Sequence, residues 1–139
     1  MSTDYIQVKA NIPICKFECP SDAKSVLLET LENHVYDLTS IPRCVEHIKF
    51  GNYFNQTIEK DVLPAGLQSI QFGYDFNQPI EKDVLPVGLL SINFGGRFNQ
   101  LIEKNVLPIG LQSIQFGGFD QPIKKDVLAL FYCSKATIK

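Results

Sequence analysis

The chain has 139 residues, of which 45% are apolar and 20% are charged, and its formal net charge is −2. This composition is typical of a folded domain and excludes a wholly disordered or collagen-like chain, and the balanced charge gives no indication of a nucleic-acid or membrane partner. Because no apolar stretch approaches the ~20 residues that span a bilayer and Asp4 stands where a secretory leader has basic residues, we expect a cytoplasmic protein.

Residues 1–37 precede the regular part of the sequence and predict an N-terminal cap with one amphipathic helix. Between residues 21 and 38, apolar side chains fall at helical spacing, at Leu27, Leu31, Val35 and Leu38. Ser21 is well placed as the N-cap of this helix. We expect the helix to cover the exposed end of the first repeat; the alternative is that it docks another protein.

Cysteines and histidines in this part of the chain suggest a comparison with zinc sites. The candidates are Cys15, Cys19, His34, Cys44 and His47. Their spacing matches no standard zinc finger, and thiols are ordinarily reduced in the cytosol. We therefore predict no metal, no cofactor and free cysteines.

A repeat dominates the sequence from residue 38 to residue 128. Three full units of equal length cover residues 48–69, 70–91 and 92–113, and the first two agree at 16 of 22 positions. A fourth unit starts at Ile114, is one residue shorter, has Asp120 where the others have asparagine, and loses the pattern after Leu128. Residues 129–139 then form a C-terminal cap or tail.

Each unit is predicted to be one coil of a β-solenoid. The segments 67–72, 89–94 and 111–116 end in the alternation of a short strand with one buried face. Proline and glycine in the rest of the unit exclude a three-turn helix, so a corner and a short extended or 3₁₀ segment must return the chain to the next strand. Copies of the strand would stack in parallel into a narrow sheet, because a single coil buries too little apolar surface to be stable alone.

Two positions of the coil have predicted structural roles. The Phe-Asn corner recurs at Phe54, Phe76 and Phe98; we expect the ring to fill the interior and the asparagine to hydrogen-bond backbone groups, stacking from coil to coil. The triplet Glu-Lys-Asp at residues 81–83 and its copies form a solvated back face. Catalysis by such carboxylates would require an enclosed site, which a repeated surface triplet does not provide.

The tail begins with an uncharged apolar run at residues 127–133, which could add a final strand. An uncovered strand of this kind would expose unpaired backbone groups and apolar side chains, which can associate with another chain. The sequence therefore predicts a possible homo-oligomer through the C-terminal strand.

The motif FNQPI at residues 76–80, followed by LPxxLxxIxFG at residues 85–95, resembles the FNIP repeat over roughly residues 42–128. FNIP repeats are leucine-rich-repeat-like and are found mostly in amoebae and the giant viruses that infect them. The resemblance implies a mainly β, leucine-rich-repeat-like solenoid that binds proteins, in the host cytoplasm if the protein is viral. The repeat often follows an F-box, which docks a substrate receptor onto a ubiquitin ligase, although residues 1–37 are short for one.

In a leucine-rich coil, the side chains that flank the inward positions of the strand face the concave side. Here these positions and two variable corner positions form the candidate partner-binding surface, namely Lys49, Gln71, Asn93, Gln115, Ser69, Ser91, Ser113, Tyr74 and Arg97. Most are neutral hydrogen-bonding side chains that could receive an extended protein segment. The alternative is a merely solvated strand face.

No nucleotide-binding, nucleophile-elbow or metalloprotease motif occurs in the sequence. We therefore expect a protein that is not an enzyme and that binds an unknown protein across the strand face. Two alternatives stay open: a ubiquitin-ligase adaptor recruited through the N-terminal helix, and a repeat product without a specific partner.

Overall fold

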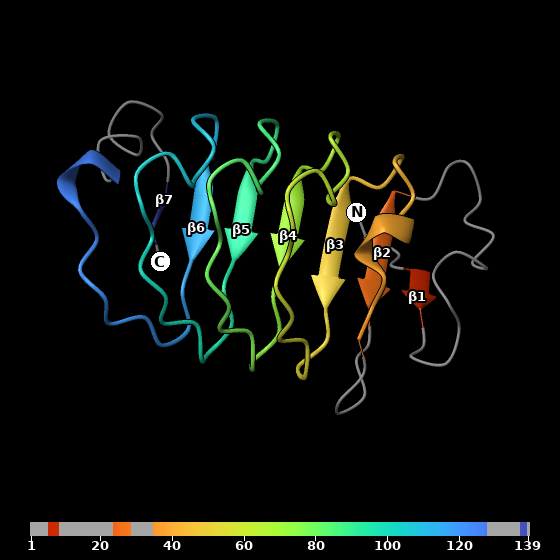
Figure 1. Cartoon of the computed structure of the whole chain (residues 1–139), viewed down its shortest axis with the longest axis horizontal. Helices are drawn as coiled ribbons and strands as arrows, with labels where there is room; N and C mark the ends of the chain where they lie inside the picture. Colours follow the sequence, from red (N-terminus) through yellow and green to blue (C-terminus); the bar gives the residue numbers. More distant parts are fainter. Residues whose placement is uncertain (1–5, 9–23, 29–34, 128–136, 139) are drawn as a thin grey trace.

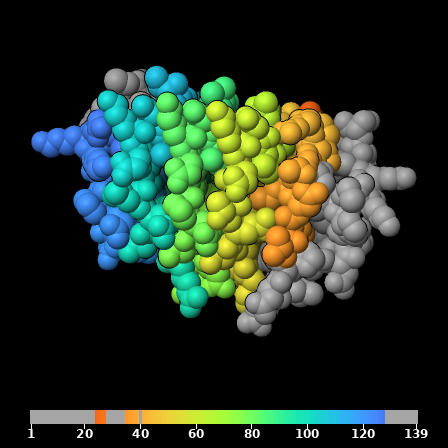
Figure 2. Space-filling model, in the orientation of Figure 1, coloured from red at the N-terminus to blue at the C-terminus, as the bar shows by residue number. Residues whose placement is uncertain are grey.

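The structure, a computed structural model, describes residues 6–8, 24–28, 35–127 and 137–138. Short strands within these ranges form one parallel sheet, in which they lie side by side in chain order (Figure 1). The strands are β1 (Ile6–Val8), β2 (Ser25–Leu28), β3 (His47–Phe50), β4 (Ser69–Gln71), β5 (Ser91–Asn93), β6 (Ser113–Gln115) and β7 (Thr137–Ile138). Successive coils form adjacent bands along the long axis of the molecule (Figure 2).

The register of the sheet follows the sequence period. Ile48, Ile70, Ile92 and Ile114 pair in succession from β3 to β6, so each coil contains one repeat unit. The predicted solenoid with a narrow parallel sheet is confirmed. Strands β4, β5 and β6 have three residues each, which is shorter than the six-residue segments that alternation indicated.

The predicted helix over residues 21–38 is wrong at residues 25–28, which form strand β2. Ser25 pairs with His47, again one repeat length away, and Val26 lies in the core at 1% exposure. The physical reason is that the edge of β3 offers backbone donors and acceptors to this segment, and such tertiary pairing overrides a helical pattern. Leu38–Ser40 is a short 3₁₀ helix, η2, and residues 21–23 and 29–34 of the predicted helix lie outside the described residues.

Two columns of phenylalanine rings run through a core whose other residues are mainly isoleucine, leucine and valine. Within a coil, the ring after the strand stacks on the ring of the corner, with centroids 3.9 Å apart for Phe72 and Phe76. Between coils, Phe76 stacks on Phe98 at 5.9 Å with an interplanar angle of 3°. The rings at the first three corners are at most 1% exposed, which confirms their predicted interior position.

The asparagines of the corners form the predicted ladder. The Oδ1 atom of Asn55 accepts a hydrogen bond from the backbone N–H of Asn77, and Oδ1 of Asn77 accepts one from Asn99, both at 2.9 Å. At the last step, Asn99 accepts from the backbone N–H of Asp120 at 3.2 Å. Each asparagine therefore satisfies a backbone donor of the following coil.

The back of each coil is formed by turns instead of a second sheet. The N–H of Leu89 donates to the Pro86 carbonyl at 3.1 Å, and the same bond recurs in the neighbouring coils. The Glu-Lys-Asp triplets are exposed, as predicted. Their third residues adopt a left-handed conformation that the repeat pattern did not indicate, with φ of 63° at Asp61, 65° at Asp83 and 66° at Asn105. Aspartate and asparagine tolerate this region better than most residues.

The C-terminal end of the array is described in part. Residues 125–127 are helical, Val127 is buried, and β7 continues the sheet beside β6. The rest of the apolar run at residues 128–133 lies outside the described residues. Within the described ranges, no helix is both long and apolar enough to traverse a membrane.

Candidate protein-interaction surface

The candidate surface is the outward face of the sheet. In β4, the Ile70 side chain points into the core and is 1% exposed, whereas Ser69 and Gln71 on either side of it are half-buried. This alternation follows from the two-residue period of a strand. Because every coil repeats it, the outward side chains of equivalent positions form straight columns.

The first column consists of small hydroxyl side chains. Ser69, Ser91 and Ser113 pair in succession along the sheet. His47 precedes them and Thr137 follows them in the same register. Neighbouring strands lie ~4.8 Å apart, so these hydroxyl groups recur at that interval.

The second column contains Lys49 and three amide side chains. Lys49, Gln71, Asn93 and Gln115 are register partners in adjacent strands, as the sequence predicted. Asn93 Nδ2 donates a hydrogen bond to Gln115 Oε1 at 2.9 Å, which aligns these two amides. The other polar atoms of these amides can point to a ligand, since each primary amide has two donors and one acceptor oxygen.

Charge on this face is concentrated at its N-terminal end. The Lys24 ammonium lies 2.9 Å from the Glu46 carboxylate, which raises the pKa of Lys24 through a hydrogen bond and charge attraction. In the following coils, Gln68, Leu90 and Gln112 succeed Glu46 at the same position of the repeat. The surface over β4, β5 and β6 is therefore uncharged.

Tyr74 and Arg97 lie at the corner that follows the strands, beside the columns. The Arg97 guanidinium lies 5.5 Å from the centroid of the Tyr74 ring, and Arg97 Nη1 is 3.1 Å from Asp75 Oδ1. The ring itself covers Gly96, where a Cβ atom would come within 2.5 Å of Tyr74 Cε2. The structure thus brings the two predicted residues together in one cluster at the corner.

Asp75 belongs to this cluster but was absent from the predicted residues. Asp75 and Arg97 occupy the same position of successive repeats. Opposite charges at one repeat position indicate an ion pair between coils, and this signal could have identified Asp75 from the sequence.

In the described part of the chain, no group of three or more histidine, cysteine, aspartate or glutamate side chains could hold a metal ion. Three of the cysteines and histidines weighed as zinc ligands, Cys15, Cys19 and His34, lie outside that part.

Short parallel strands, one per coil, with a polar outward face define a leucine-rich-repeat-type solenoid. The structure is similar to a solved structure described as the crystal structure of CroV588, a novel circular LRR protein, with a TM-score of 0.61 and 38% sequence identity. The similarity covers 76% of this chain but only 15% of that much longer chain.

The FNIP repeat matches residues 33–75 and 76–119, which together make up more than half of the sequence. The chain therefore belongs to the FNIP repeat family, as the motif predicted. A comparison with curated proteins gave no match.

Proposed function

We propose that this protein is a non-catalytic interaction module that binds an extended segment of another protein across its strand face. The observation that carries the proposal is the pair of aligned, uncharged columns on β4, β5 and β6. Hydroxyl and amide groups that recur at the strand spacing can hydrogen-bond the backbone of a peptide laid along the solenoid. We place this activity in the cytoplasm.

The uncharged side chains of the strand face determine the kind of partner that we expect. An acidic or basic ligand would be matched by charged columns, whereas Ser69, Ser91, Gln71 and Asn93 carry no charge. The expected partner is therefore a neutral, polar, extended segment. The Tyr74 and Arg97 cluster at the corner would distinguish partners, because these positions differ between otherwise similar coils.

A ubiquitin-ligase adaptor is less well supported than it was from the sequence alone. That hypothesis depended on an N-terminal helix that recruits the ligase, and residues 25–28 of that segment belong to the sheet. No other described feature favours the adaptor over a simple binding module.

The proposal can be tested with a library of displayed peptides selected on the full chain. The informative variant carries Gln71→Lys, Asn93→Lys and Gln115→Lys, which place three positive charges on the strand face. A matched control carries Thr57→Lys, Pro79→Lys and Leu101→Lys, which add the same charges at the same interval on exposed side chains elsewhere in the coil.

We expect selected peptides to bind the wild type and the control alike and to bind the strand-face variant at least about tenfold more weakly, since several hydrogen bonds of ~1 kcal/mol each are lost. Equal binding to the strand-face variant would refute the assignment of the site. A selection that enriches no peptide would instead support a repeat product without a specific partner.

A further inference from the structure

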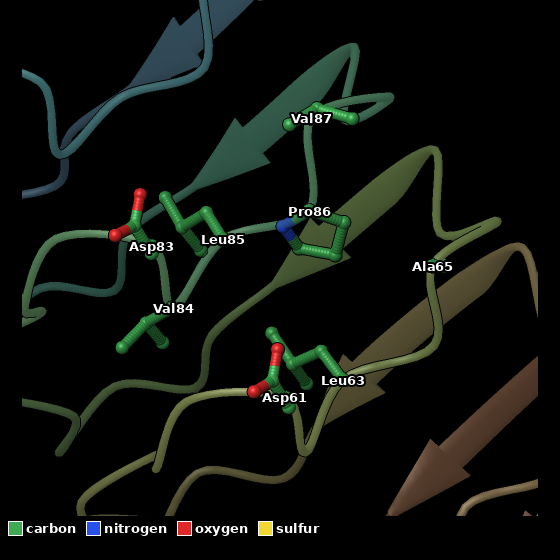
Figure 3. Close-up of a pocket in the computed structure, with 8 residues that line it drawn as sticks. All are labelled: Asp61, Leu63, Ala65, Asp83, Val84, Leu85, Pro86 and Val87. Carbon is green, nitrogen blue, oxygen red and sulfur yellow. The ribbon is translucent and has the colours of Figure 1, made fainter.

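Two equivalent grooves lie between successive coils on the back of the solenoid, away from the strand face. The first is bounded by residues 61–65 on one coil and 83–87 on the next (Figure 3). The second is bounded by residues 83–87 and 105–109. Each has a volume of about 230 Å³ and opens to solvent. We call them the first and second back grooves.

In the coil before these grooves, the corresponding space is occupied by an arginine side chain of the protein itself. Arg43 occupies the position of Ala65 and Val87 in the repeat. Its guanidinium spans to the next coil, where Nη1 lies 3.2 Å from the carbonyl oxygen of Leu63 and Nη2 lies 3.3 Å from that of Asp61. The chain therefore fills this space with an arginine side chain of its own.

The same pair of carbonyl groups recurs in both back grooves without the arginine. By the repeat, Asp83 and Leu85 correspond to Asp61 and Leu63, and Asn105 and Leu107 correspond to them in the following coil. No residue in the described part of the chain donates a hydrogen bond to these four carbonyl oxygens. Alanine and valine stand in place of Arg43 and have no side-chain donor to supply.

The lining of the grooves also suits a cation with an apolar stem. The carboxylates of Asp61 and Asp83 lie at corresponding positions on neighbouring coils of the first groove (Figure 3). The Lys60 ammonium is 3.9 Å from the Asp83 carboxylate and neutralises it only in part, since both groups are exposed. Val87 is 89% exposed and can pack against the methylene groups of a long side chain.

From these observations we propose that the two back grooves bind arginine side chains of a partner's extended segment. Each guanidinium would donate to the pair of carbonyl oxygens as Arg43 does within the chain, with additional attraction from Asp61 and Asp83 in the first groove and from Asp83 in the second. Arginine suits this arrangement better than lysine because its planar fork presents donors in a fixed geometry. The site lies apart from the proposed strand-face site and does not depend on it.

The spacing of the grooves suggests the spacing of the arginines. Neighbouring coils are ~4.8 Å apart, and side chains two residues apart in an extended peptide lie on one side at an interval of ~6.7 Å. The long, flexible arginine side chains can converge over this small difference. An Arg-x-Arg segment laid along the solenoid would therefore reach both grooves.

The test is a titration of the ¹⁵N-labelled full chain with the peptide acetyl-Gly-Arg-Gly-Arg-Gly-amide, followed by NMR. We expect backbone amide shifts concentrated at residues 83–87 and 105–109. A peptide with citrulline in place of arginine keeps the shape and loses the charge, and we expect no binding from it. Equal shifts with the citrulline peptide, or shifts that cluster elsewhere, would overturn the proposal.

Substitutions taken from the repeat itself provide matched variants that retain the fold. Asp83→Asn removes a carboxylate that lines both grooves, and Asn105→Asp adds one to the second; each new residue already occupies the same left-handed position in a neighbouring coil. We expect the first change to weaken binding of the arginine peptide and the second to strengthen it, each by about threefold, as for an exposed ion pair. Affinities that do not move in these opposite directions would contradict the assignment.

Ala65→Arg tests the use of the carbonyl groups directly. The new guanidinium should fill the first groove as Arg43 fills the preceding one. It should reduce the peptide-induced shifts at residues 83–87 without abolishing them, because these residues also border the second groove. Ala65→Gln, which has no cationic fork, should leave them in place. Unchanged shifts in the arginine variant would overturn the proposal. The strand-face variant with three lysines should bind the arginine peptide as the wild type does, so the two proposed sites can fail independently.

Discussion

Single residues in this protein act mainly on the coil that follows them. The side chain of Asn77 stabilises the backbone of the next coil, not its own, because its Oδ1 accepts the N–H of Asn99. Gln100 adds a second donor to the same oxygen at 3.1 Å. An exposed aspartate or asparagine at the back of the coil similarly permits the left-handed turn that aligns the groove carbonyls. Local side-chain chemistry is thus used to fix the geometry between coils.

Asn77→Ala should therefore destabilise the protein. The change leaves the backbone N–H of Asn99 without its acceptor in a half-buried position, and we expect a loss of about 1–2 kcal/mol in the free energy of unfolding. Urea denaturation followed by circular dichroism measures this loss. Asn77→Asp retains an acceptor oxygen and is the matched control, from which we expect a smaller loss; equal losses would show that the hydrogen bond does not matter.

At the scale of elements, close stacking of coils determines which residue can follow a strand. A Cβ atom on Gly95 would lie 1.8 Å from the carbonyl oxygen of Gly73 in the preceding coil. Gly73 has the same relation to Gly51, at 2.0 Å. None of the described glycines has a positive φ, so close approach between coils, and not backbone conformation, requires glycine at this corner.

Gly95→Ala should consequently push two coils apart. We expect a loss of about 2 kcal/mol or more in the free energy of unfolding, because the colliding atoms are backbone and cannot rotate away. Gly110→Ala is the control within the same coil: its nearest neighbour would be the Val87 carbonyl oxygen at 4.0 Å. There we expect no loss, or a gain of up to ~1 kcal/mol from the less flexible unfolded chain. Chemical denaturation of both variants tests the contrast, and a similar loss at both positions would contradict it.

For the molecule as a whole, stability comes from contacts between neighbouring coils. The rings of Phe72 and Phe94 stack across one such contact at 5.7 Å, and the strands pair only with adjacent strands. Such an array is nearly one-dimensional, and its stability is approximately a sum over repeats and their interfaces. Length can therefore change by whole coils without a change of fold.

Deletion of residues 70–91 removes one complete coil and joins Ser69 to Ile92. We expect this variant to fold cooperatively, with a lower midpoint and a smaller urea m-value, since less surface is buried. Deletion of residues 70–80 removes half a coil and should prevent folding of the C-terminal coils, because it places the Glu-Lys-Asp triplet of the back face where the strand should be. Circular dichroism and urea titration compare the two. If the whole-coil deletion unfolds and the half-coil deletion does not, the modular description is wrong.

Much of this architecture could be predicted from the sequence because repetition encodes it redundantly. The constant repeat period fixed the parallel register, and the position of the phenylalanines and asparagines within the unit indicated the core and the ladder. The same reasoning placed the columns of the candidate surface, because side-chain alternation in a strand leaves only two possible faces. Where a residue recurs at a fixed interval, its neighbours across the sheet are known without the structure.

Only the tertiary structure showed those features that arise from contacts between backbone segments whose sequences are not near-copies of each other. Residues 25–28 have a helical pattern but pair with β3, since backbone hydrogen bonding at a sheet edge outweighs a weak local preference. Ser-Val-x-Leu at these residues does match the Ser-Ile-x-Phe of later strands at the same repeat interval, a signal too short to decide against a helix. The guanidinium of Arg43 between the coils, and the carbonyl groups left open in the two back grooves, depend on the distance between backbones, which the order of residues does not specify.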